Sequence, residues 1–172
     1  MIRPPSMRGF RADQRGVATI EFALLSVMFF GVMSGALDIG IWYQQRLRLD
    51  SALEQGAMIA FNSRTTVDAA AIKTFVASAA QLSAAPTVTV GCNGGVTTAS
   101  CVNSGRSYAC VSGIGTAAIF TGATQNAKCA DGSLAGYYMT IKAVATSNTV
   151  VVPAAMLGGA MTQTRAAVIR LE

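Results

Sequence analysis

A long uncharged apolar segment near the N-terminus constrains this chain more than any other feature. Residues 22–37 (FALLSVMFFGVMSGAL) carry no charge, and residues 39–41 extend the run to about twenty largely apolar positions. At about 1.5 Å per residue, a helix of that length crosses roughly 30 Å of hydrocarbon. The sequence therefore predicts a transmembrane helix. A composition of 52% hydrophobic and 12% charged residues agrees with partial burial in lipid.

The flanks of this segment predict its orientation. Basic residues precede it and aromatic residues follow it: Arg3, Arg8, Arg11 and Arg15 on one side, Trp42 and Tyr43 on the other. The positive-inside rule then places the N-terminus in the cytoplasm. We expect a single-pass membrane protein whose head is exported. A cleavable signal peptide is the alternative, but its apolar core is shorter and ends at small residues, whereas this run leads into Asp38 and Gln44.

Charge and composition exclude several classes of function. The chain has no histidine and only eight acidic residues, so it lacks the commonest general base and metal ligand. We expect no enzyme, no cofactor and no metal. Residues 1–15 contribute +3 of the net charge of +5, and no basic cluster follows that would track a phosphate backbone. We therefore expect no nucleic-acid partner.

The first helix is predicted to continue beyond the apolar segment. Residues 44–61 contain strong helix formers and no proline, with apolar side chains at steps of three and four: Leu47, Leu53, Ala57, Met58 and Phe61. A helix over residues 17–61 would be about 68 Å long. Asn62 and Ser63 are predicted to end it. Near its middle, Gly31 and Gly35 form a GxxxG pattern that permits close helix approach, although glycine is common in membrane helices in any case.

The remaining sequence predicts a small head. Thr65 with Asp68 three residues later resembles a capping box. It is followed by one apolar face before Pro86: Val67, Ala71, Phe75, Ala79 and Leu82. Alternating residues predict strands at 87–92, at 137–145 (Tyr137, Met139, Ile141, Ala143 and Ala145 on one face) and at 162–171. The fold class is α+β: a long N-terminal transmembrane helix with an amphipathic extension, a second helix, and a small antiparallel sheet tied by disulfides.

Four cysteines lie in the part predicted to be exported: Cys92, Cys101, Cys110 and Cys129. An even number in an exported, Gly-rich domain predicts two disulfides. A zinc site is the alternative, but no C-x-x-C pair is present. If strands 87–92 and 137–145 are antiparallel, Cys92 comes close to Cys129. We therefore expect a nested arrangement in which Cys101 pairs with Cys110.

An apolar loop is predicted over residues 148–161. Its side chains include Val151, Met156 and Leu157, and the run is too short and too interrupted by Pro153 and two glycines to cross a membrane. Two interpretations remain open with equal weight. The loop is either a contact surface for another protein or a segment that folds back on the sheet and enlarges the core.

The string Arg15-Gly16-Val17-Ala18-Thr19-Ile20-Glu21-Phe22 resembles the processing site of type IV prepilins. In those proteins a membrane peptidase cuts after the glycine, so the cut here would fall between Gly16 and Val17. The resemblance implies that Glu21, with Phe22 beside it, pairs with the new α-amino group of Val17 during filament assembly. The alternative is that Glu21 lies near the membrane interface and favours the positive end of the helix dipole.

Further strings narrow the resemblance: RGVATIEFALL, Trp42-Tyr43-Gln44, GAMIA, YYMTIKAVA and MTQTRAAVIRLE. Together they resemble TadE-like proteins of the tight-adherence (Tad, Flp) pilus system. The resemblance implies a minor pilin or pseudopilin that supports pilus assembly. It divides the chain into a cleaved cytoplasmic leader (1–16), a pilin-like helix (17–61) and an exported head (62–172).

The same resemblance implies a set of partners. These are the prepilin peptidase, the major Flp-type pilin, other minor pilins and the inner-membrane assembly platform, with the extracellular pilus as a second location. A membrane-tethered periplasmic binding module without a filament role is the alternative function.

Overall fold

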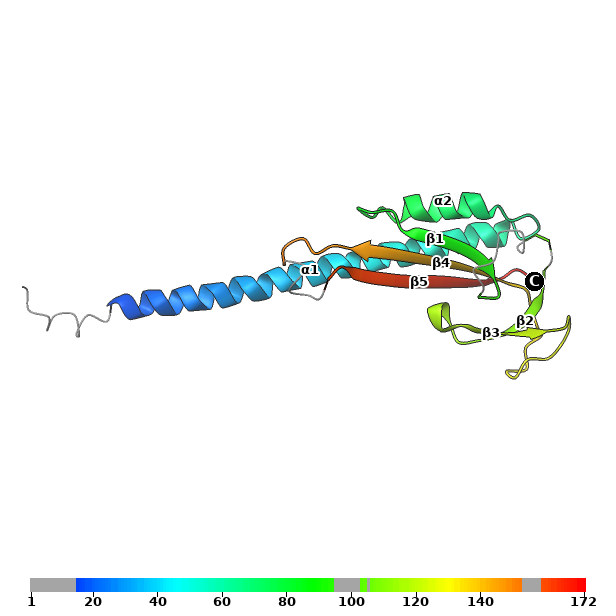
Figure 1. Cartoon of the computed structure of the whole chain (residues 1–172). Coiled ribbons are helices and arrows are strands. Elements are labelled where there is room, and N and C mark those ends of the chain that lie inside the picture. Colours follow the sequence, from blue (N-terminus) through cyan, green and yellow to red (C-terminus); the bar gives the residue numbers. More distant parts are fainter. Residues whose placement is uncertain (1–14, 95–102, 105, 153–158) are drawn as a thin grey trace, which may run out of the picture.

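A computed structural model describes residues 15–94, 103–104, 106–152 and 159–172. The elements within them are α1 (Arg15–Asn62), α2 (Ala69–Ala79), β1 (Thr87–Cys92), β2 (Tyr108–Ser112), the 3₁₀ turn η2 (Gly115–Ala117), β3 (Ile119–Ala123), β4 (Tyr138–Ser147) and β5 (Met161–Arg170). The predicted α+β class and the order of the predicted elements are confirmed. Figure 1 shows a long helix whose N-terminal half projects from a small head.

α1 runs without a break for 48 residues. The predicted helix 17–61 is thus confirmed to within two residues at each end. Its C-terminus is closed by Ser63, whose backbone N–H and hydroxyl both donate to the carbonyl of Ile59, at 3.1 and 2.9 Å. These bonds satisfy a carbonyl that the last turn leaves without an intrahelical donor. Because the helix continues through the head, its two halves share one axis direction (Figure 1).

α2 begins at a different cap from the one predicted. The side chain of Asp68 accepts hydrogen bonds from the backbone N–H groups of Ala70 and Ala71, at 3.0 and 2.9 Å. Asp68 is therefore the N-cap, not Thr65. The buried face is centred on Ile72 and Val76, whereas Ala71 is exposed. The predicted face is otherwise confirmed, since Val67 is buried and Phe75, Ala79 and Leu82 pack partly buried against the core.

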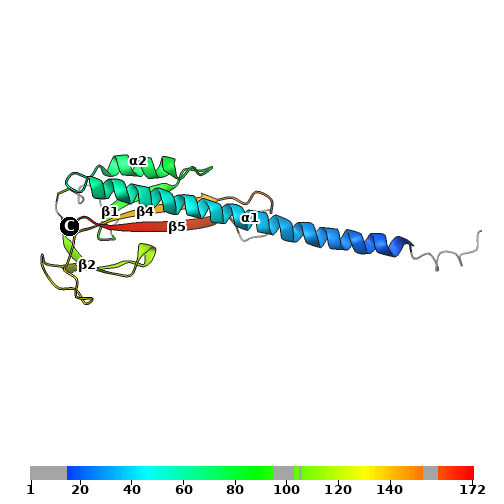
Figure 2. The same cartoon turned by 180° about the vertical axis from the view of Figure 1, so that it is seen from behind.

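The main sheet has three antiparallel strands in the order β1-β4-β5. Thr87 of β1 lies opposite Val144 of β4, and Tyr138 of β4 lies opposite Arg170 of β5. The predicted alternation along the central strand is confirmed, since Tyr137, Met139, Ile141, Ala143 and Ala145 are all buried. Their face packs against the helices, which lie together on one side of the sheet (Figures 1 and 2).

The hydrophobic core joins α1, α2, β1, β4 and β5. On α1 the buried residues are Leu49, Ala52, Leu53 and Ala60, and Ala57 is partly buried. Three residues of the predicted apolar face point elsewhere: Leu47, Met58 and Phe61 are exposed. The helix has apolar residues on more than one side here, so spacing alone could not select the side that meets the sheet.

A second, two-stranded sheet pairs β2 with β3 in antiparallel register. It lies within the Gly- and Ser-rich region for which the sequence predicted no strand. Phe120 of β3 meets Tyr138 of β4 edge to face, with ring centroids 6.1 Å apart, so the small sheet packs against one end of the face of the main sheet opposite the helices. The side-chain amide of Asn103 bonds both backbone groups of Val67, at 2.7 and 2.9 Å, and ties this region to the α1–α2 turn.

The predicted nested disulfides are wrong. Cys110 of β2 is bonded to Cys129, 19 residues later, with Cα atoms 5.5 Å apart. This pairing excludes both Cys92–Cys129 and Cys101–Cys110. Cys92 is also disulfide-bonded, and Cys101 lies outside the described residues. The prediction failed because it treated residues 93–136 as irregular, whereas β2 and the bridge between Ala109 and Gly136 carry Cys110 toward Cys129.

Candidate functional site

The predicted processing residues lie in the first two turns of α1. Val17 is 52% exposed and Phe22 is 74% exposed. A Cβ atom built on Gly16 would meet nothing within 4 Å. Val17 and Glu21 are four residues apart, so the helix places them on one face, and Glu21 is exposed. The fold itself therefore makes no packing demand on Gly16 or Glu21.

The apolar N-terminal half of α1 is exposed within the described part of the chain. Its most apolar window has a mean hydropathy of 1.9 and is 0% buried, and α1 is long and apolar enough to cross a membrane. The helix is thus consistent with a single-pass membrane anchor. A Cβ atom on Gly31 or Gly35 would also meet nothing within 4 Å. The GxxxG face is therefore open to another helix.

Asp38 connects this half of the helix to the head. Its side chain is 4% exposed, and its two carboxylate oxygens accept hydrogen bonds from three consecutive backbone N–H groups. The closest contacts are 2.9 Å from Val150, 3.1 Å from Val151 and 2.7 Å from Val152. The sequence placed Asp38 near the membrane boundary but gave it no partner. Because more than 110 residues separate the groups, no local motif indicates this contact.

The predicted contact loop is described only in part. Val150 is 70% exposed and Val151 is 47% exposed. Met156 and Leu157 lie outside the described residues. For the described part, the structure gives a position that the sequence could not: the loop leaves β4 beside Asp38 and Trp42, at the end of the head nearest the projecting helix (Figure 1).

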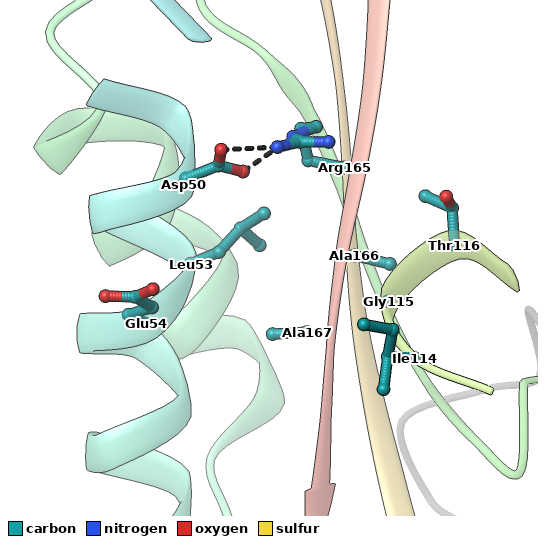
Figure 3. A pocket seen from close by; sticks show the side chains of 9 residues that line it. All are labelled: Asp50, Leu53, Glu54, Ile114, Gly115, Thr116, Arg165, Ala166 and Ala167. Carbon is teal, nitrogen blue, oxygen red and sulfur yellow. Dashed lines mark hydrogen bonds and ion pairs between the residues drawn. The ribbon is translucent and has the colours of Figure 1, made fainter. Parts of the chain in front are cut away.

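A bidentate ion pair joins the helix to the edge strand about three turns beyond Asp38. The Nε and Nη2 atoms of Arg165 donate to the two carboxylate oxygens of Asp50, both at 2.6 Å (Figure 3). Each side chain is about one third exposed. The hydrogen bond that Arg165 donates to the Asp50 carboxylate is the main cause that raises the pKa of Arg165. The pair fixes β5 against α1 in one register.

A groove of about 390 Å³ lies beside this pair. α1 forms one wall, β5 the floor and the residues around η2 the other wall (Figure 3). Its side chains include Asp50, Leu53, Glu54, Ile114, Thr116 and Arg165. The Thr116 hydroxyl has no histidine to activate it, because the chain contains none. Among the described residues, no group of three or more His, Cys, Asp or Glu side chains could hold a metal ion.

The far end of the head is held by a cluster around Tyr137, which is fully buried. Burial raises the pKa of the Tyr137 hydroxyl, so it is a protonated donor at neutral pH. It donates to Sγ of Cys92 at 3.0 Å, because a disulfide sulfur carries no proton. The Arg106 guanidinium lies over the Tyr137 ring, 5.0 Å from its centroid. These contacts are structural.

Comparison with known proteins adds one finding. The TadE-like protein family has a model that matches residues 16–58, which begin at Gly16 and include the apolar half of α1 and most of its extension into the head. Comparison with curated proteins finds no match, and comparison with solved structures finds none. The resemblance predicted from the N-terminal motif is thus confirmed, because residues 16–58 match the model of the TadE-like protein family.

Proposed function

We propose that this protein is a minor pilin or pseudopilin that supports assembly of a tight-adherence (Tad, Flp) type IV pilus. One observation carries the proposal: among the described residues, the apolar N-terminal half of α1 is exposed, and it presents Glu21 on an exposed face. A helix with no internal partner has its apolar surface available to lipid or to other helices. The TadE-like match covers this same segment.

The proposed sequence of events starts in the inner membrane. The arginine-rich N-terminus lies in the cytoplasm, the head lies in the periplasm, and a prepilin peptidase removes residues 1–16. The new amino group of Val17 then pairs with Glu21 of the same or a neighbouring subunit. A charged group inside an apolar helix bundle is costly unless it is paired, so this pairing favours entry of the helix among other pilin helices.

The partners in this proposal are the prepilin peptidase, the major Flp-type pilin, other minor pilins and the inner-membrane assembly platform. Beyond the apolar half, Leu47, Met58 and Phe61 keep large apolar side chains exposed on α1. They continue the exposed apolar surface of α1 along the part of the helix that packs in the head. This surface fits packing against neighbouring pilin helices better than it fits an isolated tether in water.

Intact-mass measurement of the membrane-extracted protein tests the processing step. We expect a mature chain that begins at Val17 in cells with the peptidase, and a slower cut in Gly16→Ala. A Cβ at position 16 meets nothing in the fold, and alanine favours a helix by about 1 kcal/mol over glycine. Slower processing therefore reports recognition by the peptidase rather than misfolding. Gly31→Ala is the matched control. A full-length product from the natural sequence contradicts the proposal and favours a tethered binding module.

Replacement of Glu21 tests the assembly step. Glu21→Gln and Glu21→Val should insert into the membrane as well as the natural chain or better, because a neutral side chain is easier to insert by roughly 2 kcal/mol or more. We expect pilus assembly to fall sharply in a strain that carries only the variant. Piliation is counted by electron microscopy beside a membrane-fractionation control. Normal piliation with Glu21→Val would show that the carboxylate has no role in assembly.

A further inference from the structure

We propose that the described start of the β4–β5 loop, at Val150 and Val151, lies in the outer boundary of the lipid bilayer and that its partner is lipid. The inference rests on the membrane-anchor part of the proposed function. It replaces both earlier interpretations of this loop, a protein contact or an extension of the core.

The depth of residues 150–152 relative to the membrane follows from the position of Asp38 along α1. Asp38 is seventeen positions beyond Glu21 in one unbroken helix, a rise of about 25 Å. We place Glu21 at the cytoplasmic boundary of the hydrocarbon core, which is roughly 30 Å thick. Asp38 then lies within about one helical turn of the outer boundary. The backbone N–H groups of Val150 and Val152 lie 2.9 and 2.7 Å from its carboxylate. The loop therefore lies at the same level as Asp38.

Hydrogen bonding at this level favours burial of the loop rather than exposure to water. A carboxylate and three adjacent backbone N–H groups are each costly to remove from water when they lack a partner. Here they satisfy one another, because both oxygens of Asp38 are used by residues 150–152. The Asp38 carboxylate and these three amides are thus paired within the protein, and the three residues that supply the amides have apolar side chains.

The exposed surface has the composition of a lipid contact. Val150 and Val151 are 70% and 47% exposed, and Ile39 on the adjoining helix is 64% exposed. No charged residue occurs in the sequence between Lys142 and Arg165. The surface is continuous with the apolar helix half that already faces lipid in this proposal. A protein partner would have to cover the valines while leaving that adjoining helix in lipid.

Trp42 and Arg46 form a pair on α1 that lies between the valines and the aqueous phase. The Arg46 guanidinium lies over the Trp42 ring, 5.9 Å from its centroid. Trp42 lines the small cavity between α1 and the start of the loop, with Asp38 and Thr149. Tryptophan and arginine beside an apolar segment are typical of the headgroup region. The valines lie on the membrane side of this pair.

The test uses the full-length chain in vesicles of phosphatidylethanolamine and phosphatidylglycerol, with and without phosphatidylcholine brominated near the start of its acyl chains. Trp42 is the only tryptophan in the sequence, so Trp42→Phe gives a background protein without tryptophan fluorescence. Single tryptophans are then introduced as Val150→Trp, as Val151→Trp, as Phe29→Trp within the membrane, and as Ile114→Trp in the head. Ile114 is the matched control, because it is 88% exposed and lines the groove at the level of Glu54.

We expect brominated lipid to reduce the emission of Val150→Trp by about twofold, as for a side chain buried roughly 5–10 Å into the interface. Phe29→Trp should behave likewise. Ile114→Trp should respond to aqueous acrylamide and not to brominated lipid. Val151→Trp provides a second position in case one substitution disturbs the loop, and circular dichroism checks the fold of each variant.

Every other outcome overturns the inference in a distinguishable way. If Val150→Trp and Val151→Trp respond to acrylamide as Ile114→Trp does, the loop lies in water. If both are shielded from acrylamide and from brominated lipid, protein covers the loop. If Phe29→Trp is also insensitive to brominated lipid, the membrane anchor itself fails, and the proposed function fails with it.

Discussion

At the scale of single residues, Asp38 has a role that its sequence context does not reveal. It is a lone acidic residue after a long uncharged run, and such a residue usually marks the end of a membrane segment. The structure adds that its two oxygens bind three consecutive amides of a distant loop. One side chain thereby sets where the end of the head meets the projecting helix.

Asp38→Asn should release this loop without unfolding the head. The amide side chain keeps one acceptor oxygen but presents an N–H₂ group to backbone donors, so at least one amide of residues 150–152 loses its partner. We expect hydrogen exchange of these amides, measured by mass spectrometry, to rise by about an order of magnitude. Asp50→Asn is the control, because it breaks the contact with Arg165 and touches none of these amides. Unchanged exchange in Asp38→Asn would show that the hydrogen bonds are dispensable.

At the scale of elements, the contact between α1 and α2 depends on a glycine. Gly56 is buried, and a Cβ atom there would lie 2.5 Å from Cγ2 of Val76 and 3.7 Å from Cδ1 of Ile141. The two helices therefore approach more closely at this point than alanine permits. The GAMIA string that contributed to the family resemblance contains this glycine, and the structure gives it a packing role.

Gly56→Ala should destabilise the head by about 1 kcal/mol. Overpacking typically costs about 1–3 kcal/mol, and the helix propensity of alanine returns up to about 1 kcal/mol. Chemical denaturation of the full chain in detergent, followed by circular dichroism, measures the change. Gly40→Ala in the same helix is the control, since its Cβ meets nothing within 4 Å, and it should be neutral or slightly stabilising.

The double variant Gly56→Ala, Val76→Ala separates the clash from other causes. Removing the valine methyl groups makes room for the new Cβ, so the double variant should lose less stability than the sum of the two single variants. Additive losses would mean that the close approach at Gly56 has no energetic importance.

The sequence predicted the elements that depend on short-range patterns. β1 has the predicted bounds, and β4 buries every predicted residue because alternation along one strand is a local property. Features that depend on tertiary contact were not predictable in the same way. The side of α1 that meets the sheet, the strands β2 and β3 and the partner of Asp38 are decided by segments far away in the chain.

The candidate site shows the same division. Gly16, Val17 and Glu21 were found because their spacing along one helix is itself the signal, and their roles stay predictions. The cysteines were found as a group, but their pairing was wrong. It depends on the register of β2, Tyr108 opposite Ala123, and on the bridge from Ala109 to Gly136. No local sequence pattern around Cys110 indicates either contact.

At the scale of the whole molecule, the head has two unequal parts. The described core residues come from the helices, the three-stranded sheet and their flanks (Figure 2). The two-stranded sheet contributes none of them, and its link to Cys129 is covalent. The core therefore stabilises the main part of the head, whereas the two-stranded sheet depends on the Cys110–Cys129 disulfide and on contacts such as that of Phe120 with Tyr138.

Reduction should act on the smaller part first. A disulfide that closes a loop of about twenty residues contributes roughly 3 kcal/mol, which is large beside the packing of the small sheet and small beside that of the main core. We expect limited proteolysis under reductant to cut near residues 108–129 while α1 and the main sheet stay intact. Simultaneous cleavage throughout the head would show that the two parts unfold together. Non-reducing peptide mapping provides the control by locating the Cys110–Cys129 link.

The continuity of α1 also gives the protein a fixed rotational phase. Each residue turns a helix by about 100°. The direction in which Glu21 faces around the helix axis therefore determines the direction in which the head faces. Two extra residues before Asp38 would turn the head by about 200°, whereas four would return it to within about 40°. If neighbours are bound on defined sides, the four-residue insertion should support more pilus assembly than the two-residue insertion, despite lengthening the helix further. Equal piliation would mean that the head swivels freely during assembly, which an unbroken helix does not allow.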